Sequence, residues 1–270
     1  MMAGLMRLLG AVALLLAVPA TAQPDEARRT SAEDIAAIQS AVDRGEMLYD
    51  YDQAAWHTTD AMREDMDPVA RGVRGWVVTP QGDGLLVTFW KADGEGFAGV
   101  YSALWTGRDV RSRTVLEGSA GRLSDEQLGQ IRAREAVDVS GLARCVDAPF
   151  NAMVIPTGEV GEVFVYFMTP QTSTKALPFG GHYRFTVRDG TVVDQRSFTR
   201  TCLDVALEGP EEGDDLVAMT VSHLLDPVPT EIHVFSMLAA RKPVFVATTT
   251  NERVWAAEVS GGQVRVRSVR

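Results

Sequence analysis

Short runs of β-branched and aromatic residues, separated by turns containing glycine, aspartate or proline, dominate the chain from residue 75 to residue 269. Runs of this length, with side chains that alternate in polarity, are typical of β-strands. The pairs Asp189-Gly190 and Gly261-Gly262 are typical of hairpin turns. No regular alternation of strands and helices supports a doubly wound parallel sheet. We therefore expect an α+β fold made mostly of antiparallel β-sheet.

The expected strands fall into two groups, one before and one after residue 140. The first group is an antiparallel meander at residues 76–79, 85–90, 97–105 and 114–116. The second group lies at residues 152–155, 163–168, 182–187, 192–198, 216–225, 231–238, 244–248, 254–259 and 264–269. Because no flexible linker separates the groups, we expect a single α+β domain over residues 30–270. Two lobes that divide near residue 140 are the alternative.

Two segments have the features of helices. A hydroxyl residue at position 30 or 31 can cap an N-terminal amphipathic helix. Asp67-Pro68 ends this helix, and Gly45 is a weak point within it. Its apolar residues recur at three- and four-residue steps and their sums: Ile35, Ile38, Val42, Tyr49 and Trp56. Ser124 caps one further helix, with acidic residues in its first turn.

The first residues follow the order of an export signal. Arg7 gives a positive start, an apolar run covers residues 8–18, and Pro19 precedes Ala20-Thr21-Ala22. This order matches a signal peptide, and the run is shorter than the roughly 20 residues of a membrane span. We expect a signal peptide over residues 1–22 and a flexible leader over residues 23–29. The mature chain would then be periplasmic or secreted, without a transmembrane segment.

Composition narrows the choice of partners. With 46% apolar residues the chain can build a core, and its formal net charge is −10. Nucleic acid and anionic membrane surfaces attract clustered lysine and arginine, so they are poor partners for such a chain.

Cys145 and Cys202 are the two cysteines, and no Cys-x-x-Cys motif is present. In an oxidising compartment this pair predicts a structural disulfide.

Two histidines stand out between residues 222 and 233. If residues 226–230 form a hairpin loop, His223 faces His233 on an otherwise apolar face, with Asp226 and Glu231 nearby. Two imidazoles and a carboxylate can bind zinc or another transition metal, so His223 and His233 are candidate metal ligands. The same surround would suit a ligand pocket. The alternative is a pair that bonds only to backbone or water at a sheet edge.

His182 is a candidate for the same site. It follows Gly180-Gly181 at the start of an expected strand, and nothing in the sequence places it beside the histidine pair. The complete set of candidate ligand-binding residues is His182, His223, Asp226, Glu231 and His233.

Motifs of catalysis give no comparable signal. Residues 94–99 match Gly-x-Gly-x-x-Gly, but an expected strand follows them where a nucleotide site needs a helix. His57 and Asp60 are spaced to hydrogen-bond on one helix face, yet no nucleophile is identifiable beside them. We therefore identify no catalytic residue and expect a glycine-rich hairpin at residues 94–99.

These observations favour an exported, non-enzymatic protein that binds an envelope protein or a small ligand. One alternative is a metal-dependent hydrolase, in which a metal held by His223 and His233 would activate a water molecule. Another is a structural component of the cell envelope. The hydrolase needs a stoichiometric metal ion, whereas the binding protein needs a pocket but no chemistry.

Overall fold

The computed structural model describes residues 30–209 and 216–269, and these residues confirm the predicted α+β fold of mostly antiparallel sheet. The predicted signal peptide (1–22) and leader (23–29) lie outside them. Three α-helices and fourteen strands are present in this part of the chain. None of its helices combines the length and the apolar character that crossing a bilayer requires.

The first sheet is the predicted meander. Its strands β1 (Gly75–Gln81), β2 (Gly84–Asp93), β3 (Gly96–Trp105) and β4 (Val110–Val115) pair antiparallel in sequence order. Gly94 has a φ of +57° in the turn between β2 and β3, a conformation that glycine adopts without strain. The Gly-x-Gly-x-x-Gly segment is thus a hairpin, as predicted.

A 3₁₀ turn, η1 (Gly118–Gly121), and the second helix, α2 (Asp125–Glu135), follow this sheet. The side chains of Ser124 and Gln127 exchange hydrogen bonds with each other's backbone N–H groups, which starts α2 at the predicted cap.

The second sheet has the order β5-β6-β8-β9 and is antiparallel throughout. Its strands are β5 (Asn151–Pro156), β6 (Glu162–Met168), β8 (Tyr183–Arg188) and β9 (Thr191–Ser197). Two further strands that we did not predict, β7 (Ala176–Pro178) and β10 (Asp204–Ala206), form a separate two-stranded ribbon.

The prediction of strands around the third sheet is wrong for one segment. It consists of β11 (Met219–His223), β12 (Val244–Thr248), β13 (Arg253–Ser260) and β14 (Gln263–Ser268). The segment at residues 231–238, which we expected as a strand, belongs to helix α3 (Glu231–Ala240). Because β11 and β12 pair in parallel, their connection must be a crossover, and α3 supplies it.

The N-terminal helix α1 (Ala32–Asp65) is capped by Ser31, one of the two predicted caps, and continues through Gly45 without a break. The predicted apolar stripe is wrong in part, because Ile35 and Trp56 are each 57% exposed. The buried face instead consists of Ala41, Val42, Gly45, Leu48, Tyr51, Ala54, Ala55, Thr58, Ala61 and Met62. Small residues on this face let other elements approach the helix closely.

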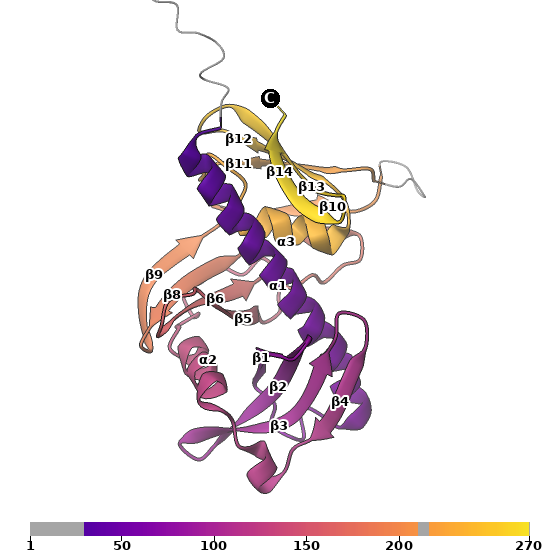
Figure 1. Ribbon diagram of the computed structural model, residues 1–270, viewed down its shortest axis with the longest axis vertical. Coiled ribbons are helices and arrows are strands. Elements are labelled where there is room, and N and C mark those ends of the chain that lie inside the picture. The colour runs from indigo at the N-terminus through magenta and orange to yellow at the C-terminus, as the bar shows by residue number, and fades with distance from the viewer. Residues whose placement is uncertain (1–29, 210–215, 270) are drawn as a thin grey trace, which may run out of the picture. The chain divides into compact units, whose positions relative to one another are not determined.

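Helix α1 contacts α3 and strands of all three four-stranded sheets (Figure 1). Leu48 and Tyr51 of α1 belong to a buried cluster that also holds Val87 of β2, Met153 of β5 and Ile232 of α3. Side chains from both sides of residue 140 thus share one core. Side chains of the long helix line both hollows described below.

Candidate functional site

A hollow of about 570 Å³ lies between α1, the β1–β2 hairpin and the turn after β3. Because an α-helix repeats every 3.6 residues, three- and four-residue steps along α1 bring one face of the helix to this hollow. The lining residues are Asp43, Glu46, Met47, Asp50 and Tyr51 from α1, and Pro80, Asp83, Gly84, Leu85, Trp105, Thr106 and Gly107 from the sheet.

The charge of this lining is entirely negative. Asp43, Glu46, Asp50 and Asp83 line it, and no lysine or arginine does, so we call it the acidic hollow. Burial raises the pKa of Glu46, and the charges of Asp50 and Asp43 raise it further. Burial also raises the pKa of Asp50. Carboxylates whose charged form is disfavoured gain from a bound cation, because the cation returns the lost electrostatic stabilisation.

The remaining surface of the acidic hollow is apolar and includes Trp105. The ring of Trp105 stacks on His57 at 4.3 Å between centroids, and His57 stacks on Trp56 at 5.0 Å. His57 is therefore part of an aromatic stack, while Asp60 forms an ion pair with Arg63 at 3.8 Å. Aromatic rings attract organic cations through their negative faces, and methylene groups pack on them.

The structure brings His223 and His233 together, but not across a hairpin. His223 ends β11 and His233 lies in the first turn of α3, with ring centroids 4.7 Å apart in an edge-to-face arrangement. Atom Nε2 of His223 lies 2.7 Å from Oδ2 of Asp226, and Asp226 also accepts a 2.7 Å hydrogen bond from Arg196. The predicted proximity of His223, Asp226 and His233 is thus present on a different backbone.

Hydrogen bonds already occupy part of this histidine pair. Nδ1 of His233 accepts the backbone N–H of Thr230 at 3.0 Å, which starts α3. Burial, together with the neighbouring His223, lowers the pKa of His233 to about 3, so the ring is neutral near pH 7. Within residues 30–209 and 216–269, no group of three or more His, Cys, Asp or Glu side chains is arranged to hold a metal ion.

Glu231 does not join the histidines. Its carboxylate, 1% exposed, accepts hydrogen bonds from Arg184 at 2.7 Å, Tyr166 at 2.9 Å and Arg44 at 3.2 Å. Residues two apart share a face in a strand but point in widely different directions in a helix, which is why Glu231 and His233 diverge. Burial acts to raise the pKa of Glu231, but the charges of Arg44 and Arg184 lower it overall.

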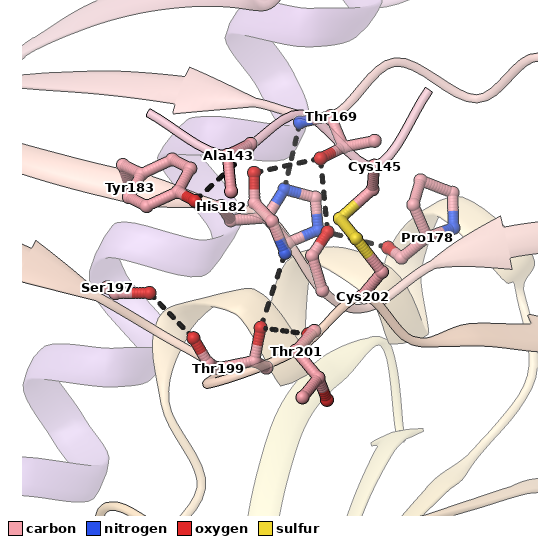
Figure 2. Close-up of a disulfide and its surroundings, with 12 residues drawn as sticks. Ala143, Cys145, Thr169, Pro178, His182, Tyr183, Ser197, Thr199, Thr201 and Cys202 are labelled. Atoms are coloured by element: carbon pink, nitrogen blue, oxygen red, sulfur yellow. Dashed lines mark hydrogen bonds between the residues drawn. A yellow bond between two sulfur atoms is a disulfide. The ribbon is translucent and has the colours of Figure 1, made fainter. Parts of the chain in front are cut away.

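His182 lies beside the disulfide (Figure 2), where backbone groups use both of its ring nitrogens. Nδ1 accepts the N–H of Thr169 at 3.1 Å, and Nε2 lies 3.0 Å from the carbonyl oxygen of Pro178. Burial lowers the pKa of His182 to about 4. With no ring nitrogen left over, His182 is a packing residue and not a third metal ligand.

The disulfide between Cys145 and Cys202 is present as predicted, with Cα atoms 5.4 Å apart. It joins the segment before β5 to the segment before β10, and Figure 2 shows it against the backbone around His182. Gly181 packs against the sulfur of Cys145 so closely that a Cβ there would clash.

Sequence reasoning did not find the acidic hollow. The available signal was the spacing of Asp43, Glu46 and Asp50 on one face of the first helix. Such a pattern is typical of a solvated helix face, and only the hairpin and turn that pack beside α1 convert it into a hollow.

In comparisons with known proteins, no protein-family model, no curated protein and no solved structure matches this chain. Its function is therefore inferred from the chemistry of the acidic hollow and of the histidine pair.

Proposed function

We propose that the chain is an exported, non-enzymatic binding protein of the cell envelope, and that its acidic hollow takes a small organic polycation such as a linear polyamine. The observation that carries this proposal is the lining of four carboxylates without a lysine or arginine. The predicted signal peptide at residues 1–22 and the disulfide between Cys145 and Cys202 support placement outside the cytoplasm.

The spacing of the carboxylates favours an extended ligand with more than one positive charge. Asp43 and Asp50 are seven residues apart on α1, which separates their Cα atoms by about 10 Å along the helix axis. A linear polyamine places ammonium groups at intervals along a methylene chain. Its charges can meet these carboxylates while its methylene groups pack on Met47, Leu85 and Trp105.

The test is isothermal titration of the purified protein with spermidine at low ionic strength. We expect saturable binding of one spermidine, and binding weakened about tenfold by the double substitution Glu46→Gln/Asp50→Asn, because two charged hydrogen-bond acceptors become neutral. Added salt should also weaken binding, since the attraction is largely electrostatic.

The matched control is Glu159→Gln, which removes one negative charge from an exposed turn away from the lining residues. It should leave the spermidine affinity unchanged. The proposal is rejected if spermidine does not bind, or if Glu46→Gln/Asp50→Asn and Glu159→Gln bind it equally well. A basic peptide that binds while spermidine does not would replace the small polycation with a protein partner.

Export is tested separately by fractionating cells that express the complete chain. A mature N-terminus at Gln23 in the periplasmic or secreted fraction is expected from the Ala20-Thr21-Ala22 cleavage site. Retention of the intact chain in the cytoplasm would remove the envelope assignment without affecting the spermidine result.

A metal-dependent hydrolase is the second candidate, favoured by one observation, the contact between the rings of His223 and His233 beside Asp226. In that case a zinc ion would need one nitrogen from each ring and an oxygen of Asp226, with an open position for water. Metal analysis separates this candidate from the binding protein, which needs no metal.

A further inference from the structure

A second hollow, of about 360 Å³, has the opposite charge. Arg63 of α1, Arg74 before β1 and Arg134 of α2 line it, and no aspartate or glutamate does. We call it the basic hollow, and we propose that it binds a small aromatic anion, with a carboxylate or phosphate group held by the arginines. This proposal is independent of the polycation site, because the two hollows share no lining residue.

Two of the three arginines, Arg63 and Arg74, keep positive charge available for a ligand. Arg63 forms a 3.8 Å ion pair with Asp60, in which both side chains are more than half exposed. Arg134 pairs with the adjacent Glu135, and within the described part of the chain Arg74 forms no ion pair. In a chain of net charge −10, this lining has arginines and no acidic residue, and the exposed Arg63 and Arg74 can attract an anion to it.

Aromatic rings form the other part of the basic hollow. Trp76 of β1, Phe89 of β2 and Phe150 before β5 line it. Phe150 is held in place by edge-to-face contacts with Phe167 and Tyr183, at 6.2 and 5.8 Å between centroids. These rings offer apolar surface to the body of a ligand whose charged group lies among the arginines.

Gly75 completes the wall between the arginines and the rings. A Cβ at this position would lie 3.3 Å from Nε1 of Trp90, closer than most side chains tolerate. That indole nitrogen is buried and has no hydrogen-bond partner among residues 30–209 and 216–269. The missing side chain at Gly75 therefore leaves room for the buried Trp90 ring to pack beside β1.

The chemical groups of the lining determine the class of ligand. Guanidinium groups bind carboxylate and phosphate oxygens through paired N–H donors, so an inorganic anion would use only the arginines. An anion with an aromatic ring would use the arginines and the three rings together. Phenyl phosphate and benzoate represent the two possible anionic groups, and inorganic phosphate represents the charge without the ring.

The experiment is titration calorimetry of the purified protein with these three compounds in a phosphate-free buffer. We expect phenyl phosphate or benzoate to bind about tenfold more tightly than inorganic phosphate, because of the added aromatic contact. Arg63→Ala/Arg74→Ala should weaken the aromatic ligand about tenfold or more, because charged hydrogen bonds are lost. Both side chains are exposed, and circular dichroism will show that the variant is folded.

Two control variants show whether the loss of affinity is specific to the basic hollow. Arg265→Ala removes an exposed arginine on β14 and should leave the affinity unchanged. Glu46→Gln/Asp50→Asn alters only the acidic hollow and should not weaken the aromatic anion. The proposal is overturned if neither aromatic anion binds, if inorganic phosphate binds as tightly as both, or if Arg63→Ala/Arg74→Ala and Arg265→Ala have equal affinities.

Discussion

Gly45 of α1 lies against Val234 of α3, and a Cβ on Gly45 would be 2.5 Å from the Cβ of Val234. Heavy atoms cannot approach so closely, so the absence of a side chain at Gly45 allows the two helices to pack. The glycine that weakens α1 as an isolated helix is thus required by its tertiary contact.

We predict that Gly45→Ala lowers the free energy of unfolding by about 1 to 3 kcal/mol, because the new methyl group forces α1 and α3 apart. The matched control is Gly129→Ala in α2, where a Cβ meets no atom within 4 Å. That substitution should instead stabilise the protein by roughly 0.5 to 1 kcal/mol through helix propensity. Urea unfolding measures both, and stabilisation by Gly45→Ala would contradict the close packing.

Asp52 on α1 should make the stability depend on pH. Burial raises its pKa from 3.8 to about 6, so ionisation disfavours the folded state near neutral pH. The free energy of unfolding should therefore rise as pH falls from 7 towards 4, as far as this residue contributes. Asp52→Asn should stabilise the protein by about 1 to 2 kcal/mol at pH 7, after allowance for solvent screening, and have little effect near pH 4.

The measurement for Asp52 is thermal or urea unfolding at several pH values, with Asp194→Asn on the exposed face of β9 as the control. The control should change the unfolding free energy by no more than about 0.5 kcal/mol at any pH. Equal pH profiles for the native protein and Asp52→Asn would show that Asp52 is not destabilised by its surroundings.

Glu231 should be a strong determinant of stability. Glu231→Gln leaves Arg44 and Arg184 without their shared counter-charge and should cost about 3 kcal/mol at pH 7. Because the pKa of Glu231 is lowered from 4.5, its stabilising effect is present at neutral pH and is lost as pH falls below that value. The difference between Glu231→Gln and the native protein should therefore shrink in acid.

Glu208, which pairs with Lys175 through exposed side chains, provides the comparison. Glu208→Gln should cost less than about 1 kcal/mol, the usual effect of a surface ion pair. If both substitutions change the urea midpoint equally, the buried cluster around Glu231 has no special role in stability.

For the histidine pair we predict zinc well below one equivalent in protein purified without a metal-binding tag. Nε2 of His223 lies against the carboxylate of Asp226, and Arg196 also donates a hydrogen bond to that carboxylate. His223 and Asp226 are therefore already engaged and not free to bind a metal ion. Metal analysis of the native protein and His223→Ala is the measurement. One equivalent of zinc that disappears in His223→Ala would favour the hydrolase and not the binding protein.

The sequence pattern predicts most strands because they are short, alternate in polarity and end at glycine-containing turns. It fails at α3 because residues 231–238 are a short segment with five apolar residues among eight, too short for its pattern to separate a strand from a helix. The start signal of α3 is also unusual. Thr230 and His233 exchange the capping hydrogen bonds, whereas the recognisable pattern has glutamate or glutamine in place of the histidine.

The histidine pair was predicted with Asp226 as a correct neighbour, with Glu231 as a wrong one and on the wrong backbone, since the loop after β11 can lead into either a strand or a helix. The two hollows could not be predicted in the same way. Arg63, Arg74 and Arg134 come from three separate elements, and only tertiary packing places them around one space.

Helix α1 is the first described element of the chain, and it contacts β14, the last. Ile38 of α1 packs on the same buried cluster as Val264 and Val266. Contacts between opposite ends of a chain form late, because closing so long a loop is entropically costly. A chain that emerges from its N-terminus therefore leaves the Ile38 part of α1 without its β14 contacts until residues 263–268 have emerged.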